Sequence, residues 1–236
     1  MAIGLLNSVE VQTLTRIKAP KRRCEFLFGR TILRCLLARY VGTVAADILI
    51  EQDSHGKPWA HTLDHREMPT FNVSHSGDVL AIALCANGEI GVDVEQTNAH
   101  LKIDIKQIAQ SNFASDECLL LKTLPPEQRL DSFLRIWTLK EAVLKAIGVG
   151  LYHPLNQINV AEPAVRYRIL LNNAGKNVYL EAEHFQSRAM SFHVTIARVG
   201  ALGVVSIFDN MLEGKYASEM ISFEHKRRTA VTGSQK

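Results

Sequence analysis

The chain has 236 residues, of which 47% are hydrophobic and 22% are charged, and its formal net charge is +3. An apolar content near the globular average excludes a disordered or fibrous chain, and so small a net charge argues against electrostatic binding of nucleic acid. No apolar stretch approaches the roughly 18 residues that cross a bilayer, and no basic segment followed by an apolar one opens the sequence, so we expect a cytoplasmic protein without membrane contact.

The first predicted element that carries reactive groups is a helix from Pro20 to Tyr40. Its apolar residues recur with the period of an amphipathic helix, and proline suits the first helical turn. Arg23, Arg30 and Arg34 follow at spacings of seven and four, which places three guanidinium groups on one stripe. A solvated basic face is the ordinary interpretation of this stripe, and an anion-binding face is the alternative.

A serine-rich turn and an apolar strand are predicted next. His75 lies between Ser74 and Ser76, so a turn here could offer hydroxyls, backbone amides and an imidazole to an anion. A purely structural serine turn is the ordinary alternative. The continuous apolar run Val79–Leu84 predicts a strand buried on both faces, and Asn87-Gly88 predicts a hairpin turn into the following strand.

The strand predicted at Ile90–Glu95 has two acidic side chains on one face. Gly91, Asp93 and Glu95 alternate with apolar residues, and the Cα atoms of the two acids lie about 6.6 Å apart at a rise of about 3.3 Å per residue. Two like charges on one face repel, and a hard cation such as Mg²⁺ would relieve the repulsion. An outward-facing acidic strand without a ligand is the alternative.

A long helix is predicted at Pro126–Ile147, and it carries Glu141 and Lys145 four residues apart. The apolar residues of the helix form one buried stripe, and this pair lies on another stripe nearly opposite. An exposed Glu-Lys pair is the ordinary interpretation, worth about 0.3–0.5 kcal/mol.

Both halves of the chain run from helix-rich to strand-rich sequence, so the predicted fold class is α+β. Further helices are predicted at 103–113 and 115–124. The strands predicted in the second half are 157–160, 165–171, 177–185, 191–198 and 203–208.

Four motifs in one order resemble those of the 4′-phosphopantetheinyl transferases of the Sfp type. They are Gly56-Lys57-Pro58, Phe71–Ser76, Gly91–Glu95, and Trp137–Lys145 followed by Gly148 and Gly150-Leu151. The pattern Arg23, Glu25-Phe26, Gly29-Arg30 and Arg34 is similar to the basic helix of the enterobactin-synthetase branch of that family.

The resemblance implies a pseudo-twofold protein in which two similar α/β lobes pack together and the active site lies in the cleft between them. The lobes would be residues 1–88 and 89–209, with the metal site in the second, and 210–236 would be a polar, partly disordered tail. The implied reaction moves the 4′-phosphopantetheine arm of coenzyme A to a serine of an apo acyl or peptidyl carrier protein. The other product is adenosine 3′,5′-bisphosphate, and a monomer is expected to suffice.

The resemblance also assigns the catalytic groups. Asp93, Glu95 and Glu141 would bind Mg²⁺ beside the diphosphate of coenzyme A. Glu141 would also take the proton of the attacking serine, and Lys145 would stabilise phosphate charge.

The remaining assignments concern coenzyme A. By resemblance, Lys57 and His75, with Ser74 close by, would bind its phosphates, including the 3′-phosphate of the adenosine end. Arg23 and Arg30 are further candidates for that 3′-phosphate.

Two other functions stay open from the sequence. One is a Mg²⁺-dependent pyrophosphohydrolase that uses the same carboxylates with water as the nucleophile. The other is a non-catalytic module that binds coenzyme A or a carrier protein.

Overall fold

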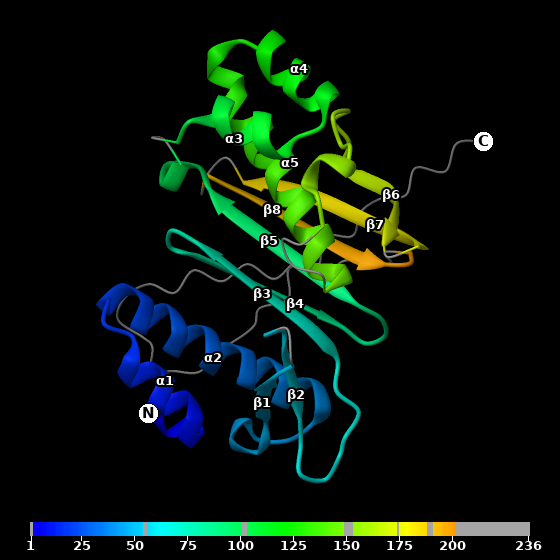
Figure 1. Cartoon of the computed structure of the whole chain (residues 1–236). Helices are drawn as coiled ribbons and strands as arrows, with labels where there is room; N and C mark the ends of the chain where they lie inside the picture. Colours follow the sequence, from blue (N-terminus) through cyan, green and yellow to red (C-terminus); the bar gives the residue numbers. More distant parts are fainter. Residues whose placement is uncertain are drawn as a thin grey trace, which may run out of the picture. The chain divides into compact units, whose positions relative to one another are not determined.

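Two 22-residue helices and a four-stranded antiparallel sheet dominate the fold of the computed structural model (Figure 1). The structure describes residues 2–53, 56–100, 103–148, 153–173, 175–187 and 191–201. All of them belong to one compact unit. Within these ranges, no helix is both long enough and apolar enough to cross a membrane.

The N-terminal half combines helices with two separate hairpins. Its elements are η1 (Ala2–Leu5), α1 (Ser8–Arg16), α2 (Pro20–Val41), η2 (Ala45–Asp47), β1 (Leu49–Gln52), β2 (Pro58–His61), β3 (Thr70–Ser76) and β4 (Val79–Cys85). Strand β1 pairs with β2 and β3 pairs with β4, both antiparallel. Leu33 and Leu37 of α2 pack with Ile48 and Phe71, so α2 and both hairpins share one apolar cluster.

The C-terminal half places a buried helix on a sheet. Its elements are β5 (Ile90–Gln96), η3 (Thr97–His100), α3 (Ile105–Asn112), α4 (Ser115–Thr123), α5 (Pro126–Ile147), η5 (Leu155–Gln157), β6 (Arg166–Asn173), β7 (Lys176–Ser187) and β8 (Phe192–Val199). The strand order is β5-β8-β7-β6, and α5 lies across one face of this sheet (Figure 1). Ile136, Leu139 and Val143 of α5 are fully buried in the largest apolar cluster.

A buried ion pair links α5 to α4. The Lys140 ammonium lies 2.7 Å from Glu117 of α4, and neither side chain is exposed. The ammonium also donates to the carbonyls of Leu155 and Ile158. Burial lowers the pKa of Lys140, and Glu117 opposes that shift. Because an unpaired buried charge is costly, these contacts favour one rotation of α5 about its axis.

The structure confirms the α+β class and most of the predicted elements, but the strand predicted at 157–160 is wrong. Ile158 and Val160 are buried, so the alternation of apolar residues is real. Their backbone groups bond side chains rather than a neighbouring strand: Ile158 accepts from Lys140, and Val160 donates to Glu117. The alternation of apolar residues therefore reflects burial of Ile158 and Val160 and does not indicate a strand here.

Two expectations for the region before β5 are also corrected. The run at 79–85 is a strand, but only Ala83 in it is buried, because β4 belongs to a two-stranded hairpin with limited cover. Asn87-Gly88 closes no hairpin, since β4 and β5 lie in different sheets. The strand predicted at 203–208 and the tail at 210–236 lie outside the described residues.

Candidate active site

Gly91 lets the helix α5 pack directly on the strand β5. A Cβ atom at this position would fall on the carbonyl oxygen of Ala142 and 2.5 Å from the backbone nitrogen of Ala146. Only glycine permits this approach without displacing backbone. Because Gly91 shares its strand face with Asp93 and Glu95, the approach brings both acids towards α5.

Asp93 is held by two groups through one of its oxygens. Its Oδ1 accepts hydrogen bonds from Lys145 Nζ at 2.6 Å and from Ser74 Oγ at 2.9 Å. Its Oδ2 is buried and has no hydrogen-bond partner among the described residues. Burial raises the pKa of Asp93, Lys145 opposes the shift, and the charge of Glu95 adds to it.

Glu141 belongs to the same electrostatic cluster. Burial raises the pKa of Glu141, the negative charge of Asp93 raises it further, Lys145 opposes the shift, and Glu95 adds to it. The interpretation of Glu141 and Lys145 as an exposed pair is therefore wrong: Lys145 bonds Asp93, and both α5 side chains face the acidic strand. A raised pKa makes a carboxylate a stronger base when it is ionised.

The three carboxylates, which we call the carboxylate cluster (Asp93, Glu95 and Glu141), suit a hard cation in part. Within the described ranges no three His, Cys, Asp or Glu side chains form a ready-made metal site. The free and buried Oδ2 of Asp93, together with two coupled carboxylates beside it, nevertheless supplies the oxygen donors that Mg²⁺ prefers, with water and a substrate phosphate to complete its shell.

The serine-rich segment lies on the strand β3 and not in a turn. Ser74 and Ser76 are buried and point towards β5, whereas His75 is exposed. By strand alternation His75 shares the face of Phe71 and Val73, which pack in the cluster with α2. The structure thus separates His75 from the two serines.

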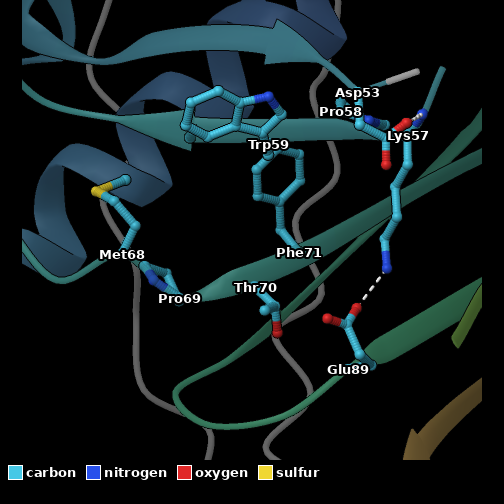
Figure 2. Close-up of a pocket in the computed structure, with 10 residues that line it drawn as sticks. Asp53, Lys57, Pro58, Trp59, Met68, Pro69, Thr70, Phe71 and Glu89 are labelled. Atoms are coloured by element: carbon cyan, nitrogen blue, oxygen red, sulfur yellow. Dashed lines mark hydrogen bonds and ion pairs between the residues drawn. The ribbon is translucent and has the colours of Figure 1, made fainter. Parts of the chain in front are cut away.

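Lys57 lines a pocket of about 270 Å³ in the N-terminal half (Figure 2). Its ammonium points to Glu89 and bonds it, and the rings of Trp59 and Phe71 lie on another side of the pocket. The lining residues are Asp53, Lys57, Pro58, Trp59, Ala60, Met68, Pro69, Thr70, Phe71 and Glu89. A Cβ at Gly148, just after α5, would lie 3.9 Å from Lys57 Nζ, so the pocket adjoins the end of that helix.

The pocket does not include the carboxylate cluster. Glu89 precedes Asp93 by four residues, about 13 Å along an extended strand. Thr70 of the pocket begins β3, and His75 lies near its end. The structure therefore places the Lys57 pocket at the start of β3 and His75 near the end of β3, where the neighbouring Ser74 bonds Asp93.

The three arginines of α2 do not form one solvated basic face. Arg34 is 1% exposed and bonds Glu10 and the carbonyl of Ile48. Arg30 is partly buried, lies 3.8 Å from Glu10 and stacks over Phe26, and burial lowers its pKa. Arg23 is exposed. Arg34 is a core residue because a 22-residue helix on a hairpin buries one side of its basic stripe.

The sequence reasoning missed the roles of Asn72 and Ser76. Both are buried on β3, Asn72 accepts from the backbone of Val92, and Ser76 donates to Glu95 at 2.6 Å. The alternation of polar residues at 72, 74 and 76 with Phe71, Val73 and His75 was the available signal.

A bulkier residue at Gly91 is expected to disturb both the fold and the site. We expect Gly91→Ala to lower the free energy of unfolding by about 1–3 kcal/mol, the usual cost of overpacking a core, because the new Cβ meets helix backbone that cannot turn aside. The matched control is Gly29→Ala in α2, where the nearest atom would be Leu80 Cδ1 at 3.9 Å. That change should stabilise by about 0.5–1 kcal/mol, as alanine does in helices. Denaturant unfolding measures both, and equal stabilities would contradict the close packing.

Two family models and several known proteins match this chain. The model of the 4′-phosphopantetheinyl transferase superfamily matches residues 89–197, and a model described as 4′-phosphopantetheinyl transferase, N-terminal, matches residues 1–87. A Synechocystis protein is 35% identical over 174 residues, which are 74% of this chain and 70% of that protein. The 4′-phosphopantetheinyl transferase HetI of Nostoc is 35% identical over 67% of this chain and 68% of its own. The 4′-phosphopantetheinyl transferase gsp of Aneurinibacillus migulanus is 28% identical over 83% and 79%.

Proposed function

Because the chain belongs to the 4′-phosphopantetheinyl transferase superfamily, we propose that this enzyme transfers the 4′-phosphopantetheine arm of coenzyme A to a serine of an apo acyl or peptidyl carrier protein. The reaction would depend on Mg²⁺ and release adenosine 3′,5′-bisphosphate. The observation that carries the proposal is Asp93, with one oxygen held by Lys145 and Ser74 and the other buried without a partner in the described ranges.

The residues can perform a phosphoryl transfer. The serine oxygen of the carrier protein forms a bond to the phosphorus that bears pantetheine, and the bridging oxygen of the diphosphate leaves with adenosine 3′,5′-bisphosphate. Glu141 accepts the serine proton, for which its raised pKa suits it. Lys145 stabilises charge on the phosphate oxygens. Mg²⁺, when held by the carboxylate cluster, would neutralise the diphosphate.

The donor molecule would lie along β3 and β5. The basic end of α2 lies beside the β3–β4 turn, because Lys21 bonds Asp78 at 3.1 Å, and His75 is exposed close to that turn. We therefore assign the 3′-phosphate to His75 with Arg23 or Arg30 as a partner. Lys57, at the other end of β3, would meet another part of coenzyme A in its pocket.

The two-lobe arrangement is part of the proposal. Residues 1–88 and 89–209 would be related lobes. In support, α2 and α5 have 22 residues each, both begin with a proline, and each is followed by a glycine in the left-handed conformation. Strands follow each helix.

Intact-mass analysis of a carrier protein tests the proposal. The purified chain is incubated with coenzyme A, Mg²⁺ and a panel of apo carrier proteins. We expect one carrier protein to gain the mass of a single phosphopantetheine arm, in a reaction that a chelator stops. Cleavage of coenzyme A without any carrier protein would favour a pyrophosphohydrolase instead. Binding of coenzyme A without cleavage or transfer would favour a non-catalytic module.

A further inference from the structure

The strand β5 has an edge that is covered by side chains and not by another strand. Strand β5 is the outermost strand of the sheet β5-β8-β7-β6, and one of its two edges pairs with β8. The amides on its other edge bond side chains of β3: Val92 donates to Asn72 Oδ1 at 3.0 Å, and Gln96 donates to Ser76 Oγ at 3.1 Å. An edge strand usually presents such amides to solvent or to another chain. Here the side chains of β3 make the hydrogen bonds that a neighbouring strand would make.

The hydroxyl of Ser74 has no hydrogen-bonding capacity left. A serine hydroxyl offers one proton and two lone pairs. Ser74 Oγ donates its proton to Asp93 Oδ1 and accepts from Lys145 Nζ at 3.1 Å and from the Val94 amide at 3.4 Å. A hydroxyl engaged in this way has no proton left to donate to a phosphate. The family resemblance, by contrast, places Ser74 among the phosphate-binding residues.

Ser76 repeats the arrangement one step along the strand. Its Oγ accepts from the Gln96 amide and donates to Glu95 Oε2 at 2.6 Å. In both serines a backbone amide of β5 fixes the oxygen, so the proton is directed to a carboxylate on the same strand. Asn72 differs because its side-chain oxygen accepts from a backbone amide, that of Val92, and not from a group that also holds a carboxylate.

We propose that Ser74 and Ser76 are positioning residues that orient Asp93 and Glu95 for the cation. The inference rests on the proposed Mg²⁺-dependent transfer. By holding Oδ1, Ser74 and Lys145 leave Oδ2 of Asp93 as the oxygen that faces the ion. The strand β3 of the N-terminal half thereby completes a metal site whose ligands all come from the C-terminal half.

Binding of Mn²⁺ to the full chain in the presence of coenzyme A tests this role. The variants are Ser74→Ala, Ser76→Ala and the matched control Asn72→Ala, which removes a side-chain bond to the same strand edge but none to a carboxylate. Calorimetric titration with a blank of coenzyme A and Mn²⁺ gives the dissociation constants. We expect both serine variants to bind Mn²⁺ about 10-fold to 100-fold more weakly, the usual effect of removing a partner of a metal ligand, and Asn72→Ala to bind as the wild type.

Kinetics of carrier-protein loading complete the test. The serine variants should need correspondingly more Mg²⁺ for half-maximal rate, with the KM for coenzyme A unchanged. An unchanged Mn²⁺ affinity with a raised KM for coenzyme A would overturn the proposal and make Ser74 a phosphate ligand. An equal loss of affinity in Asn72→Ala would overturn it in favour of simple packing between the strands. If the wild type itself neither loads a carrier protein nor binds Mn²⁺, the proposed function fails before the serines are tested.

Discussion

Loading of a carrier protein is expected to fall by at least about 10³-fold in the Asp93→Asn variant, because a bound divalent cation contributes several kcal/mol and each 1.4 kcal/mol is about tenfold in rate. Asparagine keeps the size of the side chain and one oxygen, but it removes the charge that binds both the cation and Lys145. The rate of single-turnover loading, followed by intact mass, measures the loss. A large excess of Mg²⁺ should not restore the rate.

The fold of Asp93→Asn should persist. Asp93 is 4% exposed and burial disfavours its charged form, so removing the charge relieves that cost. Lys145 loses its charged partner but keeps its bond to Ser74. Denaturant unfolding checks this, and Glu127→Gln, an exposed carboxylate in the first turn of α5, is the control that should load at the wild-type rate. Loading by Asp93→Asn within a few-fold of the wild type would remove Asp93 from the site.

Replacement of Glu141 by glutamine is expected to slow loading by on the order of 10²-fold or more, the usual contribution of a general base. Glutamine preserves the shape of the side chain and cannot accept the serine proton. Because burial and Asp93 raise the pKa of Glu141, its protonated form dominates below that raised pKa and the wild-type rate should fall as the pH is lowered through it. The glutamine variant should lose this dependence, which a pH profile of single-turnover loading would measure.

The affinity for coenzyme A provides the control for Glu141→Gln. It is measured without a divalent cation and is expected to change little, because Lys57 and His75, which are assigned to coenzyme A, are unaltered in this variant. A rate close to that of the wild type, with the same pH profile, would show that another group takes the proton.

Most elements of the fold follow from local rules. Proline at the first turn and a glycine after the last predict both long helices, and α5 begins and ends at the predicted residues, Pro126 and Ile147. The strands β5 to β8 lie within a few residues of the predicted ranges. The segment at 157–160 was predicted wrongly because its backbone bonds buried side chains of distant helices, Lys140 and Glu117, which no local pattern encodes.

The carboxylate cluster was predicted in part. The family resemblance singled out Asp93, Glu95 and Glu141, and the structure couples their charges. The sequence could not assign the hydrogen-bond partners of these acids. The bonds from Ser74 and Ser76 join residues 19 apart, and the bond from Lys145 joins residues 52 apart. The basic stripe on α2 shows the same limit, since the burial of Arg34 depends on Glu10 and Ile48 of other elements.

The sequence by itself determined the α+β class, most of the helices and strands, the family resemblance and the acidic residues, because periodicity, capping and the order of motifs can be read along the chain. Only the tertiary structure decided which oxygen of Asp93 is held and which is free, that His75 and Ser74 face opposite ways, and that β3 covers the open edge of β5. Those outcomes depend on the close packing at Gly91 and on the hydrogen bonds that buried polar groups must form. Both are properties of the assembled fold.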